Sequence, residues 1–418
     1  MTVSGRRPAL WFAIFVVFID ALGMSIIIPI LPDLLEELTG RTIAETAFIG
    51  GVMTAVYALN QFLFGPIIGA LSDRYGRRPV ILLSLGALTI DYILMAVSWT
   101  VWILFIGRFL AGFAGASYTV AAAYIADVSD RNKRSENFGL IGAAFGLGFV
   151  IGPALGGMVG AEFGTRAPLW LSAGLCFGGV LFGLFVLPES LRDENRRSFS
   201  LRNANPFSSL LRAFSLPGLG MFLAAYVLIT LADFTYPAIW AYWSKEVFAW
   251  DARMIGFSLA VYGVFTALVQ GGLIRAVIPR LGEPRTIWLG LSFAVASFFM
   301  IGTATTSWMV FAIIPISSIS HLLGAALTGM MTREVSDSEQ GELQGILGAI
   351  GAVTSVVSAI VMTWIFLKTG NEQAAIYMPG APFLLAGTLT LIAALPLWVA
   401  LSRVRARSRA VGGGQASG

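Results

Sequence analysis

Charged side chains are scarce in this chain. Asp, Glu, Lys and Arg make up 12% of its 418 residues, whereas hydrophobic residues make up 57%. A typical soluble domain carries about 25% charged residues, and it could not bury this much apolar surface. Lipid as the solvent removes that requirement. The composition and the mean hydropathy of +0.80 therefore predict an integral membrane protein.

Cysteine and histidine are nearly absent, with one residue of each type, Cys176 and His321. A single cysteine excludes an internal disulfide and a cysteine-based metal site. The sequence also has no Walker phosphate-binding loop, no clustered metal ligands and no convincing nucleophile–base pair. These absences argue against an enzyme, a metal site and ATP-driven transport, and they leave an ion gradient as the energy source.

Twelve continuous apolar runs of about 20 residues dominate the sequence. A helix of that length crosses the roughly 30 Å hydrocarbon core of a bilayer. A membrane β-barrel would instead need short strands of alternating hydrophobicity. We therefore predict an all-α integral membrane protein with twelve transmembrane helices, at approximately 9–32, 47–71, 79–98, 101–125, 138–161, 167–187, 217–240, 255–279, 285–303, 306–328, 343–367 and 380–401.

The second half of the chain repeats the first at a nearly constant offset. Three short matches carry the repeat: Glu136-x-x-Gly139-x-x-Gly142 with Glu342-x-x-Gly345-x-x-Gly348, Arg74-Tyr75-Gly76 with Arg280-Leu281-Gly282, and Val128-Ser129-Asp130 with Val335-Ser336-Asp337. Parallel repeats of this kind place a substrate site between the two halves, near the middle of the membrane. The predicted parts are an N-terminal six-helix half, a linker loop, a C-terminal six-helix half and a tail, at 1–187, 188–216, 217–403 and 404–418.

Basic residues are unevenly divided between the two sides of the predicted bundle. The side that carries both termini and the linker holds 21 of the 27 Lys and Arg residues. The opposite side holds five, namely Arg41, Arg166, Lys245, Arg253 and Lys368. Because cytoplasmic loops are enriched in Lys and Arg, both termini and the linker loop are predicted to be cytoplasmic.

Four charged residues lie deep inside the apolar runs, away from their ends: Asp20, Asp91, Arg108 and Asp233. A charge at membrane depth costs a few kcal/mol or more on roughly any scale, so it usually faces a cavity or a partner. Asp20 and Asp91 are the leading candidates for proton coupling or substrate binding. Arg108 stays charged at any relevant pH, so it can attract an anionic group but cannot carry protons; alternatively it extends to the membrane surface.

Asp233, His321 and Gln61 are further candidates. Asp233 is expected near the outer end of span seven, as either a solvated acid at a cavity mouth or a functional one. The histidine pKa of about 6.5 would suit a proton carrier, although a structural interhelical histidine is the simpler interpretation. Gln61 could offer a neutral polar contact to a ligand.

The predicted turn between spans two and three carries the first strong motif. It contains Gly69, Asp73, Arg74, Gly76, Arg77 and Arg78. An aspartate among three arginines suggests a charge network that stabilises one state of a gating loop. A basic loop that only sets topology is the alternative.

The fifth span carries the second motif, in which Gly148, Gly152 and Gly156 recur every four residues. This spacing gives one helix face almost without side chains, where another helix can approach closely. Pro153 and Gly157 lie within the same stretch, and proline favours a kink. We expect this span to form a gated contact between the halves; helix packing alone is the alternative.

These motifs together resemble the major facilitator superfamily, and the bacterial tetracycline/proton antiporters in particular. The matching stretches are Ile19-Asp20-Ala-Leu-Gly23, Pro29-x-Leu-Pro32, Leu71 to Tyr92, the Arg108 motif, Ala123-x-Ile-Ala-Asp127 and the glycine stripe. The resemblance implies the twelve-span major facilitator fold, alternating access and efflux of a drug in exchange for protons in a bacterial inner membrane. It implies no cofactor; a tetracycline could travel as a chelate with a divalent cation. The expected partners are the drug, protons and lipid, not nucleic acid, and the chain is expected to be a monomer.

Two positions depart from the tetracycline exporters. Thr266 stands where they carry a histidine in span eight, and Ala294 stands where they carry an aspartate in span nine. The substrate and the proton route therefore stay open. The alternatives are an importer of a sugar or an organic anion on the same fold, and a membrane receptor or scaffold without transport.

Overall fold

A computed structural model describes residues 3–115, 117–130, 133–191, 194, 196, 216, 218–336 and 339–414. Within these ranges the regular structure is helical, without a strand. Most of the predicted linker, 188–216, and the last four residues of the predicted tail lie outside the described residues.

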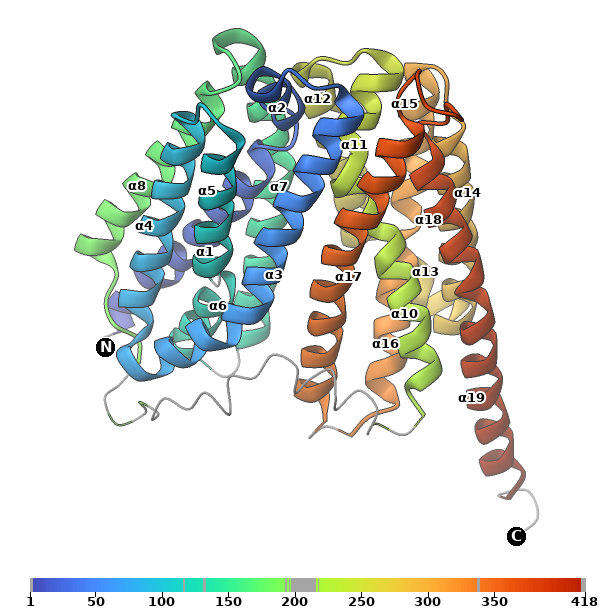
Figure 1. The fold of residues 1–418 in the computed structure, drawn as a ribbon. Coiled ribbons are helices and arrows are strands. Elements are labelled where there is room, and N and C mark those ends of the chain that lie inside the picture. Colours follow the sequence, from blue (N-terminus) through green and yellow to red (C-terminus); the bar gives the residue numbers. More distant parts are fainter. Residues whose placement is uncertain are drawn as a thin grey trace.

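The helices of each half form one bundle (Figure 1). The N-terminal half contains α1 (Val3–Ile26), α2 (Leu31–Thr39), α3 (Ile43–Tyr75), α4 (Arg77–Ala96), α5 (Val101–Ala114), α6 (Ser117–Val128), α7 (Arg134–Phe163) and α8 (Ala167–Val186). The C-terminal half contains α10 (Gly220–Asp233), α11 (Thr235–Phe248), α12 (Ala252–Leu268), the π-helix η3 (Val269–Leu273), α13 (Ile274–Leu281), α14 (Glu283–Gly302), α15 (Ser307–Ile319), α16 (His321–Arg333), α17 (Gln340–Thr369), α18 (Ala381–Ile392) and α19 (Ala394–Gly414).

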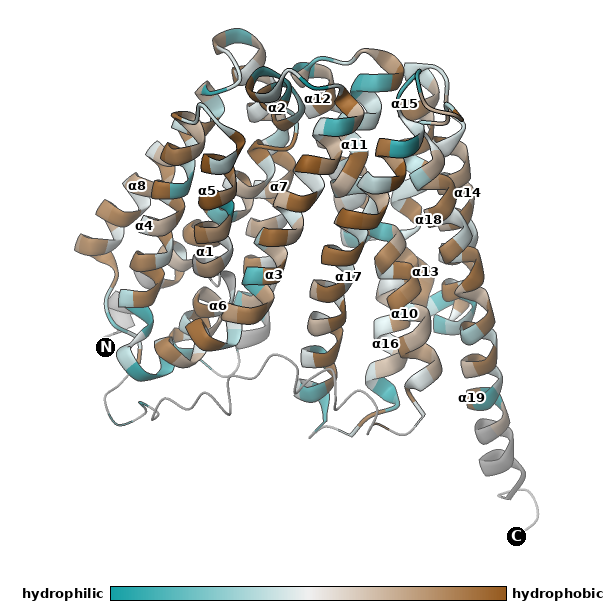
Figure 2. Cartoon of the chain, viewed as in Figure 1, coloured by the Kyte–Doolittle hydropathy of each residue, from teal (hydrophilic) through white to brown (hydrophobic). Residues whose placement is uncertain are grey.

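The described helices reproduce the predicted spans. Ten segments are long and apolar enough to cross a membrane, and α1 with α2, bent by 49°, makes an eleventh. The predicted fourth span is occupied by two shorter apolar helices, α5 and α6. Apolar residues cover the helices along the bundle, while hydrophilic residues gather at its two ends (Figure 2). The predicted all-α membrane architecture is confirmed.

The seventh span extends further than its apolar run suggested. Helices α10 and α11 together run from Gly220 to Phe248, so Asp233 lies at the middle of the span and not near its outer end. The helix continues past Trp240 to Phe248, and Lys245 near its end is bound by Asp33 and Glu36 of the N-terminal half. The predicted position of Asp233 was therefore wrong.

The two halves meet at the end of the bundle that carries Lys245, called here the Lys245 end. A Cβ on Gly157 of α7 would collide with the carbonyl oxygen of Ala252 on α12, and one on Gly256 with that of Pro153. Helices α3 and α17 touch in the same way, because a Cβ on Gly51 would collide with Thr363. Small residues thus let backbones of the two halves approach closely.

The opposite end, called here the Arg77 end, carries both chain termini in Figure 1. There, glycines of α3, α7 and α17 have open space beside them, because no atom lies within 4 Å of a Cβ built on Gly69, Gly146 or Gly348. Helices α3 and α17 diverge toward this end (Figure 1). The halves are therefore closed against each other at the Lys245 end and separated at the Arg77 end.

The hydrophobic core follows the same division. One cluster of buried residues combines both halves, from Ile19 to Ala386. Two further clusters each belong to a single half, one between Phe12 and Leu187 and the other between Leu216 and Leu401. The shared cluster accompanies the closed end, and the separate clusters stabilise each half on its own.

Replacing Gly157 with valine should destabilise the closed end. The added side chain would force α7 away from α12, and overpacking of this kind costs about 1–3 kcal/mol. We expect Gly157→Val to lower the midpoint of thermal unfolding in detergent, and Gly146→Val on the same helix, where space is open, to leave it nearly unchanged. Equal effects of the two substitutions would contradict the described contact.

Candidate functional site

A buried ion pair lies inside the N-terminal half. Arg108 of α5 donates a hydrogen bond to Oδ2 of Asp91 on α4, whose side chain is 0% exposed. A Cβ on Gly107 would lie 2.5 Å from Oδ1 of Asp91, so glycine is needed for this approach. The guanidinium lies 5.7 Å and 5.9 Å from the ring centres of Tyr57 and Tyr92. Cation–π attraction therefore adds to the ion pair.

This pair has unused hydrogen-bonding capacity. Oδ1 of Asp91 and Nε of Arg108 are buried and have no hydrogen-bond partner among the described residues. A buried polar atom without a partner costs about 1–3 kcal/mol, so the arrangement is open to a further polar partner such as water, a proton or a ligand.

Asp20 of α1 lies beside this pair. It is buried, with 6% of its surface exposed, and its charge interacts with Tyr57 and Tyr92, the same two rings that flank Arg108. Within the described part of the chain, no hydrogen bond or ion pair satisfies its carboxyl group. Asp20 therefore shares two aromatic neighbours with the Asp91–Arg108 pair. The sequence had marked the three residues singly and had not predicted that they share neighbours.

Gln61 of α3 joins the same region. Its Nε2 donates to the carbonyl oxygen of Gly115 at 2.9 Å and to the hydroxyl of Tyr57 at 3.5 Å. Gly115 follows the end of α5, so the amide connects α3 to the break in the fourth span. Gln61 therefore has a positioning role beside the ion pair.

The remaining two candidates lie in the C-terminal half, apart from this group. Tyr262 of α12 and His321 of α16 share a hydrogen bond of 2.9 Å between the tyrosine hydroxyl and Nε2. Asp233 is exposed at the end of α10. Sequence reasoning missed Tyr262; its position one helical turn before Thr266 was the available signal.

The predicted gating loop forms the expected charge network. Arg77 contacts Asp73 at 2.5 Å and Asp127 of α6 at 3.3 Å, and it donates to Oγ of Ser72 at 2.5 Å. Arg74 is exposed and lies over the ring of Tyr75. Gly69 has open space beside it. The network holds the loop to its own half and leaves Arg74 turned outward.

Glu189, which follows α8, fixes the same loop and was missed by sequence reasoning. Its carboxylate accepts from the backbone N–H groups of Arg77 and Arg78, at 2.9 Å and 3.2 Å. A carboxylate at a helix N-terminus satisfies free donors and complements the helix dipole. Gly76 has φ +106°, and a Cβ there would collide with Glu189. Glycine is therefore required for both the backbone angle and the space.

The C-terminal half contains a charge-reversed counterpart. Glu283 and Arg333 form an ion pair of 2.9 Å. Both residues follow Arg77 and Asp127 by the offset of the internal repeat, which is 206 residues. The repeat therefore preserves an ion pair at this place while exchanging the acid and the base.

Two faces of the fifth span make different contacts, and the glycine stripe is one of them. Cβ atoms on Gly148, Gly152 and Gly156 would meet backbone atoms of α1, within the same half. Residues four apart share one helix face, and here that face packs inside the N-terminal half. The expected contact between halves is instead formed by Pro153 and Gly157, which meet α12.

Ion pairs at the Lys245 end connect the halves directly. Lys245 binds Asp33 and Glu36, and Arg253 binds Glu162. Sequence reasoning had used both basic residues only for topology. The described residues include no group of three or more His, Cys, Asp and Glu side chains that could hold a metal ion.

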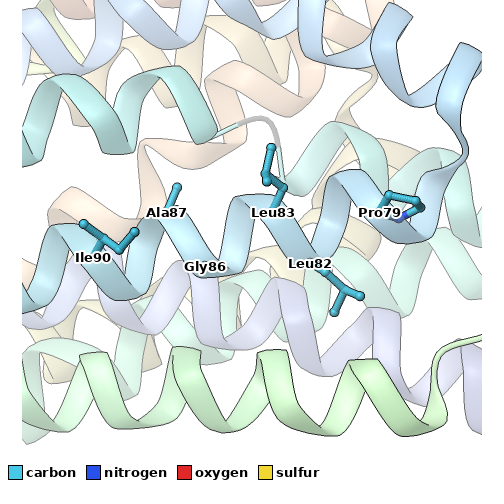
Figure 3. A pocket seen from close by; sticks show the side chains of 6 residues that line it. All are labelled: Pro79, Leu82, Leu83, Gly86, Ala87 and Ile90. Carbon is cyan, nitrogen blue, oxygen red and sulfur yellow. The ribbon is translucent and has the colours of Figure 1, made fainter.

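One surface groove lies apart from this site. It has a volume of about 500 Å³, and its lining, shown in Figure 3, consists of Pro79, Leu82, Leu83, Gly86, Ala87 and Ile90. Leu83 and Ile90 are 70% and 54% exposed, whereas Asp91 on the same helix is buried. The groove therefore lies on the outer, lipid-facing side of α4.

The match to a family model decides the class. Residues 13–332 match the model described as Major Facilitator Superfamily. The chain belongs to this superfamily of membrane transporters. A tetracycline resistance protein of class C from Escherichia coli is 37% identical over 379 residues, covering 89% of this chain and 95% of that protein. A class G protein from Vibrio anguillarum is 35% identical and covers 90% and 95%. The predicted resemblance is confirmed.

Solved structures of this superfamily share the fold. A bacterial homologue of the human lysosomal transporter Spinster, in an inward-facing and unoccupied conformation, matches with a TM-score of 0.78 at 15% identity, covering 96% of this chain and 98% of that chain. At this identity the likeness supports the fold alone.

Removing both members of the buried ion pair should cost less than the two single removals added together. Asp91→Asn or Arg108→Gln alone leaves an uncompensated charge, which costs about 3–5 kcal/mol. We expect each to lower the midpoint of thermal unfolding in detergent, and the double variant to lower it by less than the sum. The control Arg253→Gln, in an exposed pair, should cost less than about 1 kcal/mol. Additive single effects would contradict coupling of Asp91 to Arg108.

Proposed function

We propose that this transporter exports tetracycline or a similar amphipathic drug in exchange for protons, by alternating access. It would act in a bacterial inner membrane with both termini in the cytoplasm, so the Arg77 end is the cytoplasmic end. The similarity to tetracycline resistance proteins over about nine-tenths of the chain supports a drug as substrate. The observation that carries proton coupling is the buried Asp20 beside the Asp91–Arg108 pair.

The arrangement around Asp20 suits loading and release of a proton. In the open state, a carboxyl group with no partner among the described residues is free to bind a proton or a cationic part of the drug. Arg108 cannot give up its proton, so it acts by attracting whichever carboxylate is charged. A movement that changes the distance from Asp20 to Arg108 changes which carboxylate is better stabilised.

Thr266 and Ala294 stand where the tetracycline exporters carry a histidine and an aspartate. The ionisable groups of the C-terminal half therefore lie at other positions in this chain. The Tyr262–His321 hydrogen bond provides a titratable group one helical turn from Thr266. Tetracycline exporters and this chain would therefore share the N-terminal proton site and differ in the C-terminal half.

Exchange measured in everted vesicles tests this function. In vesicles that carry the protein and a preformed pH gradient, tetracycline should drive proton release. We expect Asp20→Asn to abolish the release and Glu372→Gln, an exposed carboxylate at the Lys245 end, to preserve it. A response only to another amphipathic compound would keep export and reject tetracycline. No response to any exported compound, with uptake of a sugar or organic anion instead, would overturn the proposal.

Alternating access also requires the Arg77 end to close in another state. Helices α3 and α17 run antiparallel from their contact between Gly51 and Thr363. Arg74 lies 23 residues beyond Gly51, and Glu342 lies 21 residues before Thr363. At 1.5 Å per residue these distances are about 34 Å and 32 Å, so the two opposite charges are level along the helices. Closure would bring them together, and the internal repeat supplies Arg280 and Glu136 as a second pair.

Swapping the charges of Arg74 and Glu342 tests whether the two residues pair. Arg74→Glu and Glu342→Arg should each weaken closure of the Arg77 end by about fivefold, the effect of losing roughly 1 kcal/mol, and the double variant should restore it. The readout is maleimide labelling of Gly69→Cys in a Cys176→Ser background, because closure would protect position 69. Lys368→Gln at the other end is the control. A double variant that labels like the single ones would contradict the pairing.

A further inference from the structure

Asp233 is an exposed carboxylate at the middle of a membrane span. Its side chain lies on the same helix face as Tyr236, three residues later, and the hydroxyl of Tyr236 shares a hydrogen bond of 3.0 Å with Ser317 of α15. That face therefore points into the C-terminal half and away from lipid. Among the described residues, no basic side chain forms an ion pair with Asp233.

Two stacked tyrosines stand beside this carboxylate. The rings of Tyr236 and Tyr262 are 6.0 Å apart with an angle of 27° between their planes, and both lie within the electrostatic reach of Asp233. The ring of Phe298 also stacks on that of Tyr236, with 5.2 Å between the ring centres. Both tyrosines are half-buried, whereas Phe298 is fully buried behind them. The accessible surface is thus aromatic and is supported by a rigid apolar layer.

Hydrogen bonds to polar partners fix the two ring planes. Ser317 holds the hydroxyl of Tyr236, and His321 holds that of Tyr262 at 2.9 Å. Preorganised rings lose little conformational entropy when a flat ligand stacks on them. His321 therefore acts as a positioning residue for Tyr262.

The charge balance of the interior points to a cation as the ligand. A carboxylate at membrane depth is costly unless it has a partner. The interior cation of the N-terminal half, Arg108, is already bound to Asp91. The described basic residues of the C-terminal half, such as Lys245 and Arg285, lie near helix ends. Asp233 is thus accessible and has no basic partner among the described residues, so a cationic ligand can pair with it.

We propose that Asp233, Tyr236 and Tyr262 form a recognition site for a planar aromatic compound that carries a positive charge. The carboxylate binds the charge, and the tyrosine faces bind the ring system by stacking and cation–π attraction. This site rests on the proposed export function, for which it specifies the substrate class. It lies in the half where the relatives' histidine and aspartate are replaced.

A pair of ligands that differ only in charge tests the site. Phenanthridine is uncharged at mildly alkaline pH, and N-methylphenanthridinium carries the same three rings with a permanent positive charge. Equilibrium dialysis against the full chain in nanodiscs should show that the cation binds at least about tenfold more tightly than the neutral compound. Equal binding of the two compounds, or tighter binding of the neutral one, would overturn the proposal.

Variants separate the charge from the rings. Asp233→Asn should weaken binding of the cation by about tenfold and leave binding of neutral phenanthridine unchanged. Tyr236→Leu should weaken binding of both compounds strongly. Tyr262→Phe keeps the ring but loses the hydrogen bond to His321, so it should weaken both by a smaller factor. Glu246→Gln, on α11 in the same span as Asp233, is the matched control. An Asp233→Asn variant that binds the cation as the parent does would overturn the role of Asp233.

The binding experiment and the exchange experiment can give negative results independently of each other. Loss of tetracycline-driven proton release with normal, Asp233-dependent binding of the cation would reject the exchange mechanism and keep the recognition site. Normal exchange with charge-independent binding would reject the recognition site and keep the exporter.

Discussion

Close contact between backbones at residues without bulky side chains is the constraint on which the rest of this structure depends. Helices α7 and α12 approach at Gly157 and Gly256, and helices α3 and α17 approach at Gly51. Side chains at these positions would hold the halves apart. Because these contacts lie toward the Lys245 end, each half keeps its own core elsewhere. The proposed alternating access would rotate the halves about this end.

Charge is distributed asymmetrically inside the two halves. The N-terminal half concentrates Asp20, Asp91 and Arg108 around two tyrosines, with one ion pair formed and one carboxylate unsatisfied by described residues. In the C-terminal half, the interior is mainly aromatic, with Asp233 and His321 at its polar edge. In the proposed exchange, the N-terminal site would bind protons and the C-terminal surface would bind the flat body of a drug. Alternating access would couple the two.

The sequence predicted the fold because long apolar runs and an internal repeat are local properties of the chain. It also marked Asp20, Asp91 and Arg108 as charges at membrane depth that need a cavity or a partner, but it did not predict which of them pair. Glu189 and Tyr262 were missed because their roles depend on contacts between distant helices. Asp233 was misplaced because the helix continues beyond its apolar run into the polar stretch that ends at Phe248.

The direction in which the glycine stripe faces is a further feature that the sequence did not predict. Spacing alone predicts a smooth helix face, but it does not say which helix covers that face. Gly148 and Gly152 pack on α1 of their own half, whereas Gly157, one position off the stripe, meets the other half. A difference of one residue thus separates packing within a half from the contact about which the halves would rotate.

Distances between spin labels at the two ends test alternating access most directly. One pair at Tyr75 and Gly341 reports the Arg77 end, and one pair at Arg41 and Glu372 reports the Lys245 end, each in a Cys176→Ser background in nanodiscs. Addition of drug and a change of pH should shorten the first distance and lengthen the second. Distances that change together, or that stay constant in protein that exchanges drug for protons, would contradict the account.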